Sequence, residues 1–358
     1  MNKRIFKDQT SESGEVPFFK IGTFGKKPDS FISKKLFDEY KSKYPYPKVG
    51  DILISASGSI GRTVVYKGED AYFQDSNIVW LEHDGRLKNS FLEQFLKRTK
   101  WNKIEGSTIK RLYNKDILNK KINLPKLKEQ EKIGQLFQYL DKTITLHEEK
   151  HRQLEQLKKA LLQKMFADET GYPLLRFKGF TEKWEQVELN DIAPVTMGQS
   201  PNSKNYTENP NNYILVQGNA DLFNGQVLPR IYTTQVTKVA HVGDILMSVR
   251  APVGNIAQTQ YDVVIGRGVA AISGNLFIKQ LLNKMDKAGY WNKYIAGSTF
   301  ESVNSNDIKS ANIKVPKLEE QEKIGQLFQS LDKTITLHDK KIQYLKQLKR
   351  GLLQKVFI

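Results

Sequence analysis

One stretch of this chain occurs twice, and that repeat constrains the fold more than any other feature. Residues 124–166 return as residues 315–357, and 31 of the 43 aligned positions are identical. The string EQEKIGQLFQ is the same in both copies. Each copy follows a stretch that has diverged much further. We therefore expect an internal pseudo-two-fold repeat in which a variable globular module precedes each fixed segment.

Both copies have the pattern of a long helix. Each opens with a proline, Pro125 or Pro316, which a helix tolerates only in its first turn. Apolar residues then recur at intervals of four and three, which is typical of a coiled-coil seam. In the first copy this series begins with Ile133, Phe137, Leu140 and Ile144. A helix of that length, about 60 Å, cannot leave its apolar face exposed. We expect the two copies to pair as an antiparallel coiled coil.

These observations predict an α+β protein of two globular mixed α/β modules separated by two long helices. The expected boundaries are module 1 at 1–124, helix 1 at 125–167, module 2 at 168–315 and helix 2 at 316–358. Module 1 is shortened at its start. When the modules are aligned on their shared VGDIL motif, the opening of module 2 at 172–193 has no counterpart in module 1.

Three further features of the repeat leave alternatives open. Gly134 and Gly325 each cost a helix roughly 1 kcal/mol against alanine, which indicates close packing against another helix. His147 and His338 fall on the seam. They either fix its register or, in a less favoured interpretation, serve a catalytic or metal site. A second apolar stripe packs against the chain's own modules or against other chains.

The net charge of +17 and the pI of about 9.6 call for an anionic partner, although a merely soluble basic protein is an alternative. Module 1 carries net +9 and module 2 net +1, so the excess is not confined to one tail. No apolar run is long enough to span a bilayer, and the first residues lack a signal-peptide pattern. There are no cysteines, and no metal-binding motif is present. We expect a cytoplasmic protein that binds nucleic acid and no metal.

Matching landmarks indicate that the two modules share a fold and differ in the side chains that they display. Val49–Gly61 matches Val242–Gly254, and Trp101–Ile117 matches Trp291–Ile308. Small residues let backbone approach DNA closely, and arginine contacts phosphate or guanine. A plain turn with a solvated basic pair remains an alternative after each Gly-Ser-Thr. The candidate DNA-binding residues are Ser55, Ser57, Ser59, Arg62, Thr108, Lys110 and Arg111 in module 1, and Ser248, Arg250, Asn255, Arg267 and Thr299 in module 2.

The repeated L/VPKLxEQEKIGQLFQxLDKTITLH helices, together with VGDIL and GST…NKDI or GST…NSNDI, resemble the DNA-specificity subunit of type I restriction–modification enzymes. The resemblance covers essentially the whole chain. It implies two target-recognition domains that each read half of a split double-stranded DNA site. It also implies that the helices serve as a spacer and as a platform for methyltransferase (modification) subunits, two in number, with restriction subunits as possible further partners.

The resemblance implies that this chain binds no cofactor itself. S-adenosylmethionine would come with the modification subunits, and ATP with magnesium would come with restriction subunits. The residues expected to contact partner subunits are Gln130, Ile133, Leu136, Tyr139, Gln321, Ile324 and Leu327.

Two other functions compete with DNA reading. An enzyme, either a nuclease or a methyltransferase, is disfavoured because the chain has no Asn-Pro-Pro-Tyr type tetrapeptide, Walker lysine or glycine-rich cofactor motif. A structural coiled-coil adaptor that binds nucleic acid non-specifically is disfavoured by the divergent modules.

Overall fold

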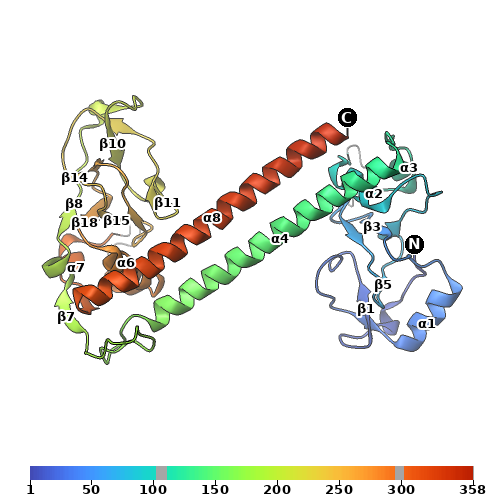
Figure 1. Ribbon diagram of the computed structural model, residues 1–358, viewed down its shortest axis with the longest axis horizontal. Helices are drawn as coiled ribbons and strands as arrows, with labels where there is room; N and C mark the ends of the chain where they lie inside the picture. Colours follow the sequence, from blue (N-terminus) through green and yellow to red (C-terminus); the bar gives the residue numbers. More distant parts are fainter. Residues whose placement is uncertain (102–110, 295–301, 358) are drawn as a thin grey trace. The chain divides into compact units, whose positions relative to one another are not determined.

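The computed structural model describes residues 1–101, 111–294 and 302–357. The chain forms two compact units: unit 1 is Met1–Glu148 with Lys340–Ile358, and unit 2 is Glu149–Asp339. Figure 1 follows the elements along the chain. In the described part of the chain, no helix is both long and apolar enough to cross a membrane.

Unit 1 contains two small three-stranded sheets, in the orders β2-β1-β5 and β4-β3-β6. Its strands are β1 (Val16–Phe19), β2 (Phe31–Ile32), β3 (Ile52–Ser55), β4 (Thr63–Val65), β5 (Tyr72–Phe73) and β6 (Ile78–Trp80). Its helices are η1 (Lys7–Gln9), α1 (Lys34–Lys43), α2 (Asn89–Arg98), α3 (Asn114–Leu118) and the first part of α4 (Leu127–Lys164). Strand β3 is buried along its whole length, and its apolar side chains form the centre of the module.

Unit 2 contains a five-stranded sheet, β14-β17-β10-β13-β9, a six-stranded sheet, β11-β12-β16-β15-β18-β8, and the pair β19-β7. Its strands are β7 (Glu185–Glu188), β8 (Val195–Met197), β9 (Tyr206–Thr207), β10 (Tyr213–Val216), β11 (Leu222–Phe223), β12 (Gln226–Val227), β13 (Tyr232–Thr233), β14 (Val239–Ala240), β15 (Ile245–Ser248), β16 (Ile256–Gln258), β17 (Val263–Ile265), β18 (Val269–Ile272) and β19 (Asn312–Val315). Its helices are α5 (Leu189–Ile192), η2 (Ser203–Asn205), η3 (Asn219–Asp221), α6 (Leu276–Lys287), η4 (Tyr290–Tyr294), α7 (Ser305–Lys309) and the first part of α8 (Leu318–Val356).

The two units repeat one arrangement of strands. Strand β1 pairs in parallel with β5, as β10 pairs in parallel with β17. Strand β3 pairs with β6 as β15 pairs with β18, and both pairs are antiparallel. The expectation that the modules share a fold is therefore confirmed at the level of strand pairing. The β7–β19 pair of unit 2 has no equivalent among the described strands of unit 1.

The long helices α4 and α8 begin two residues after their prolines, at Leu127 and Leu318. The first helical hydrogen bonds are accepted by the carbonyls of Lys126 and Lys317, the residues after the prolines. The proline carbonyls accept from side chains instead. Gln130 Nε2 donates to the Pro125 oxygen at 2.9 Å, and Gln321 Nε2 donates to the Pro316 oxygen at 2.8 Å. The prolines therefore lie ahead of the first turn rather than in it.

Within unit 1, the start of α4 packs against the end of α8. Phe137, Leu140 and Ile144 share a buried cluster with Leu345 and Phe357. Asp141 pairs with Lys349, and Glu148, further along α4, pairs at 2.6 Å with Lys346, which comes earlier in α8. These two segments therefore run in opposite directions. Within unit 2, Lys158 pairs with Asp332 at 2.6 Å.

The repeated glycines pack against a helix, as predicted, and that helix belongs to the glycine's own unit. A Cβ at Gly134 would lie 2.2 Å from the Ser90 hydroxyl at the start of α2. A Cβ at Gly325 would lie 2.7 Å from the Leu276 Cβ and 3.0 Å from the Phe277 nitrogen at the start of α6. Glycine at these positions lets the long helix approach each module's own helix.

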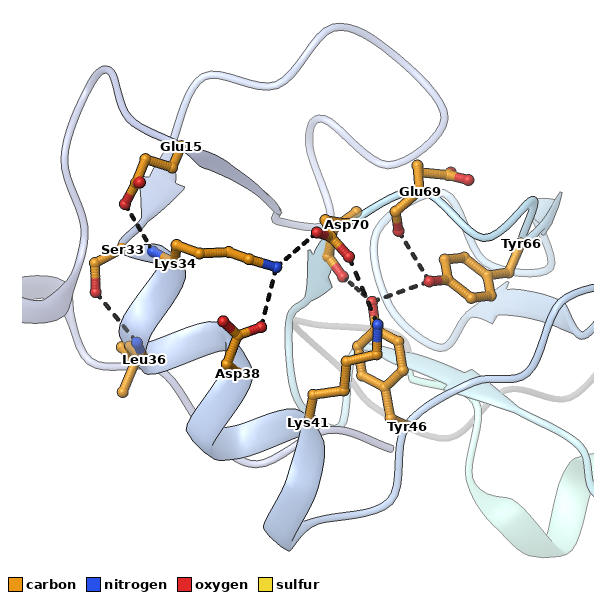
Figure 2. A network of polar contacts seen from close by, with 11 residues as sticks. Glu15, Ser33, Lys34, Leu36, Asp38, Lys41, Tyr46, Tyr66, Glu69 and Asp70 are labelled. Carbon is orange, nitrogen blue, oxygen red and sulfur yellow. Dashed lines mark hydrogen bonds and ion pairs between the residues drawn. The ribbon is translucent and has the colours of Figure 1, made fainter.

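A network of polar contacts joins α1 to the residues just before β1 and β5 (Figure 2). The Lys34 amine lies 2.7 Å from one oxygen of Asp70 and 3.0 Å from Asp38, and Lys41 lies 3.6 Å from Asp70. Lysine in the first turn of a helix opposes the helix dipole, and Asp70 offsets that cost. These two lysines are already paired, so they offer less to a phosphate than free lysines would.

This network predicts a pH dependence for unit 1. The hydrogen bond from Lys34 holds the pKa of the Asp70 carboxyl below its ordinary value. A lowered carboxyl pKa contributes stability above its ordinary range, and that contribution is lost as pH falls through the lowered value. Asp70→Asn should therefore unfold at lower urea than the parent chain at neutral pH, with the gap closing in strong acid. Asp8→Asn, an exposed acid outside the network, is the control, and a gap independent of pH would contradict the prediction.

Candidate nucleic-acid interface

A serine at the end of the central strand shapes the same loop in both modules. Ser55 is buried, and its hydroxyl donates to the Ser59 oxygen and accepts from the Arg62 nitrogen at 3.0 Å. Ser248 is buried likewise, donating to the Pro252 oxygen at 2.7 Å and accepting from the Asn255 nitrogen at 3.0 Å. The two serines predicted to touch DNA therefore hold their own loops.

A later segment of each module closes the loop. The Leu112 nitrogen donates to the Ala56 oxygen at 2.7 Å, and the Val303 nitrogen donates to the Val249 oxygen at 3.1 Å. One isolated β-bridge accompanies each bond, between Ser57 and Arg111 in module 1 and between Arg250 and Ser302 in module 2.

The two bridges carry the same pair of residue types in opposite order. By alignment, Ser57 corresponds to Arg250 and Arg111 corresponds to Ser302. The backbone is the same in both, because its bonds depend on main-chain atoms and on the buried serine. The side chain presented at each position has changed, so module 1 offers its arginine from the later segment of the bridge and module 2 from the earlier one.

In module 1, several candidate side chains of this region hydrogen-bond to other residues of the same module. Arg62 donates to the Phe24 oxygen at 2.9 Å and to the Ser59 hydroxyl at 3.3 Å, which ties the loop to a neighbouring turn. The Arg111 guanidinium donates to the Ser76 oxygen at 3.0 Å and remains half-exposed. The Ser57 hydroxyl donates to Asn77 at 2.8 Å. Arg62 and Arg111, which are both partly exposed, and the exposed Ser59 are the members of this set that can reach a ligand.

In module 2, two candidate arginines meet at one hollow of about 550 Å³. Arg250 and Arg267 both line it, both are exposed, and neither has an ion-pair partner among the described residues. The other polar side chains on the hollow include Tyr206, Gln217 and Asn219. An open, polar hollow with two unpaired guanidinium groups fits a phosphate or the edge of a guanine.

The sequence patterns did not predict Tyr206, Gln217 or Asn219, which also line this hollow. Asn219 is held in place by Asn255, whose amide donates to it at 2.5 Å, so Asn255 acts through Asn219. Gln217 and Tyr206 come from segments outside the aligned landmarks. They come together with Arg250 only in the folded chain, so no local sequence motif could predict them. The candidates Thr108, Lys110 and Thr299 lie outside the described residues.

The residues expected to contact partner subunits fall into two groups. Gln130 is buried, accepting from the Lys88 nitrogen at 2.8 Å, and Gln321 accepts from the Asn275 amide at 2.8 Å. Ile324 is buried, while Ile133 and Leu327 are partly buried and pack inside their own units. In contrast, Leu136 and Tyr139 are exposed on α4. Only these two have side chains open to another chain in this conformation.

The comparison with protein families decides what kind of chain this is. The family model described as the type I restriction modification DNA specificity domain matches residues 1–156 and 181–347. The chain belongs to this family. Its two matched stretches each contain one of the two loops shaped by a buried serine, 55–62 and 248–255, which we call the twin loops, so a specificity-domain fold is present twice.

Several known specificity proteins are similar to this chain. A putative type I restriction enzyme specificity subunit of Haemophilus influenzae is 59% identical over 147 residues, which cover 41% of this chain and 37% of that protein. The putative MjaX specificity subunit of Methanocaldococcus jannaschii is 28% identical over 332 residues, covering 85% of this chain and 77% of that protein. The matched region thus spans little more than a third of the first relative.

A solved structure supports the fold. The type I restriction–modification S subunit from M. genitalium superposes with a TM-score of 0.68 at 16% identity, covering all of this chain and 92% of that one. At this identity the likeness concerns the fold alone. The loops at 55–62 and 248–255 each lie in one of the two stretches that match the specificity domain, whereas the hollow beside Arg250 and Arg267 belongs to module 2.

Proposed function

We propose that this chain is the non-catalytic DNA-reading subunit of a type I restriction–modification complex, and that each module reads one half of a split double-stranded site. The proposal rests on the two loops. Their backbone hydrogen bonds are the same, but the arginine of the β-bridge is at position 111 in module 1 and at position 250 in module 2. Two domains that recognise different DNA sequences need the same backbone and different side chains on it. A structural adaptor would need neither the divergence nor the unpaired arginines on the hollow.

From the charge distribution we infer that the two modules contribute differently to DNA affinity and to sequence specificity. Phosphate contacts supply affinity that is sensitive to salt and indifferent to sequence, whereas base contacts supply specificity. Module 1, at net +9, should carry more of the salt dependence than module 2, at net +1. In module 2 the few positive groups would serve specificity, with Arg250 and Arg267 as the candidates for guanine or phosphate contacts.

The long helices would set the distance between the half-sites. We propose that α4 and α8 pair along their length as an antiparallel coiled coil, which the opposed contacts within unit 1 support. Modification subunits, two by the internal repeat, would dock on exposed residues of the helices such as Leu136 and Tyr139. Those subunits would bring S-adenosylmethionine, and restriction subunits, where present, would bring ATP and magnesium.

The reading of separate half-sites is tested by single arginine changes. The site is first mapped by methylation in a cell that carries this gene with its partner subunits. Arg250→Ala should then weaken binding about 5- to 100-fold, the worth of one good base contact, and reduce discrimination in the second half-site only. Arg111→Ala should act on the first half-site only.

Binding is measured on duplexes altered in one half at a time, across a salt series. Arg111→Ala should flatten the salt slope by about one unit if the Arg111 guanidinium binds a phosphate. Lys178→Ala removes one exposed charge of unit 2 away from the hollow and is the control. Equal weakening on both half-sites from either arginine change would show that the reading surface lies elsewhere.

A further inference from the structure

Unit 2 carries a tight β-hairpin that presents one phenylalanine to solvent. Strands β11 and β12 pair with Phe223 opposite Gln226, and Asn224 and Gly225 form the two-residue turn between them. Both turn residues have positive φ, 49° and 71°, as a type I′ turn requires. The inward side chains of the hairpin belong to a buried core cluster, whereas Phe223 is 62% exposed. A single exposed apolar residue is ordinary, so its meaning depends on where the hairpin lies.

The hairpin is joined to the twin loop of module 2. Strand β12 pairs in parallel with β16, and the Gln258 nitrogen donates to the Gly225 oxygen at 3.0 Å. Strand β16 begins at Ile256, directly after the twin loop 248–255. Asn219, which comes just before the hairpin and lines the hollow, accepts a hydrogen bond from the Asn255 amide. The hairpin is therefore continuous with the surface that we assign to DNA.

The same connection has a cationic tip in unit 1. The hairpin lies between β10 and β13, which are antiparallel neighbours as β1 and β2 are, so residues 20–30 are its counterpart. This counterpart also lies against its twin loop, because the Arg62 guanidinium donates to the Phe24 oxygen at 2.9 Å. Phe24 is buried at 1% exposed, and Lys26 and Lys27 are exposed. One place beside the twin loop thus displays two lysines in the module of net +9 and a phenylalanine in the module of net +1.

We propose that Phe223 inserts between two base pairs of the second half-site, so that module 2 recognises in part how readily that step unstacks. The inference rests on the proposed DNA-reading function. Phenylalanine is one of the apolar side chains that proteins use as wedges between base pairs. The cost of deforming DNA depends on the sequence deformed and is lowest at pyrimidine–purine steps, so a wedge gives specificity without a hydrogen bond to a base. It also supplies contact with DNA in a module where positive groups are scarce.

Base unstacking is measured on the full 358-residue chain without modification subunits. The duplex carries the mapped site, with 2-aminopurine, which fluoresces more strongly when it is unstacked, in place of one adenine at a time. The parent chain should raise the fluorescence at one step of the second half-site. Phe223→Ala should lose that rise and bind about 5- to 100-fold more weakly, the worth of one aromatic side chain stacked on a base. Phe223→Leu, which is still an apolar wedge, should keep most of the rise.

A mismatch placed at the same step gives an independent readout. The mismatch removes part of the cost of unstacking, so it should strengthen binding by the parent chain and leave binding by Phe223→Ala unchanged. Tyr213→Ala is the matched control. It removes an aromatic side chain that is 55% exposed, at the opposite end of β10 from Gln217 on the hollow, and should change neither readout. Lys26→Ala combined with Lys27→Ala should flatten the salt slope on the first half-site and leave the fluorescence rise intact.

The possible failures are distinguishable. A rise that survives in Phe223→Ala, or no rise at any position while the mapped site is bound, would overturn the wedge and leave the DNA-reading function standing. Failure of the parent chain to bind the mapped site would refute the DNA-reading function on which the wedge depends. If Phe223→Ala binds DNA as the parent does but abolishes methylation by the reconstituted complex, then Phe223 contacts a partner subunit, and the wedge is again overturned.

Discussion

Gly325→Ala is expected to lower the free energy of unfolding by up to about 2 kcal/mol, while Gly351→Ala in the same helix raises it by up to about 1 kcal/mol. Alanine is the better helix former at both positions by about 1 kcal/mol. At Gly325 the new methyl group would lie 3.0 Å from the Phe277 nitrogen and 2.7 Å from the Leu276 Cβ, so α6 must move. Overpacking of this kind costs about 1–3 kcal/mol. Nothing lies within 4 Å of a Cβ at Gly351.

The two variants are compared by urea unfolding of the full chain, followed by circular dichroism. Unit 2 should unfold earlier in Gly325→Ala. Gly134→Ala should act on unit 1 in the same way, because its Cβ would lie 2.5 Å from the Ser90 Cβ. If Gly325→Ala and Gly351→Ala stabilise the chain equally, then α8 does not lie against α6 as closely as these distances require.

The second large effect concerns methyl transfer. The purified chain should transfer no methyl group to DNA, and the complex with modification subunits should do so at the mapped site. Replacing Leu136 and Tyr139 together by Asp should reduce methylation by the reconstituted complex about 100-fold or more. Two exposed apolar side chains at an interface centre are worth about 2 kcal/mol each, and a buried unpaired carboxylate adds to the loss.

Incorporation of labelled methyl groups is measured at fixed concentrations of modification subunit, together with DNA binding by the variant alone. Binding by the chain alone should be unchanged, which separates docking from reading. Thr145→Asp, at an exposed position on another side of α4, is the control. Methylation by the isolated chain at the rate of the complex would refute the non-catalytic assignment.

The repeat made the helices predictable, because a sequence period is a local property that survives without knowledge of the fold. Phe137, Leu140 and Ile144 are buried where the four-three spacing put them. Gly134 and Gly325 are packed closely for the same reason. What the spacing could not tell was the partner of each glycine, since the starts of α2 and α6 reach the helices only after each module folds.

The candidate site was harder to predict because one residue pattern serves two physical purposes. A loop rich in serine and glycine permits close approach to DNA, and it equally permits a buried hydroxyl to tie the loop to itself. Ser55 and Ser248 do the second. Gln130 was expected to face a partner, but its amide is held by the backbone of its own module. The hollow gathers Tyr206, Gln217 and Arg250 from segments far apart in sequence, which no local pattern can reveal.

Serine and arginine have exchanged places between the bridges Ser57–Arg111 and Arg250–Ser302, and this exchange indicates how such a protein can change the DNA sequence that it recognises. In module 2 the bonds that hold the loop run through main-chain atoms and one buried hydroxyl, and none of them depends on the side chains at 250 and 302. In module 1 the Ser57 hydroxyl donates to Asn77 and the Arg111 guanidinium donates to the Ser76 oxygen. A substitution at an exposed position such as 250 alters folding stability by about 0.5 kcal/mol or less, whereas position 57 is buried and a change there costs more. Module 2 can therefore accept a new side chain at position 250, and with it a changed recognition sequence, without passing through an unstable intermediate.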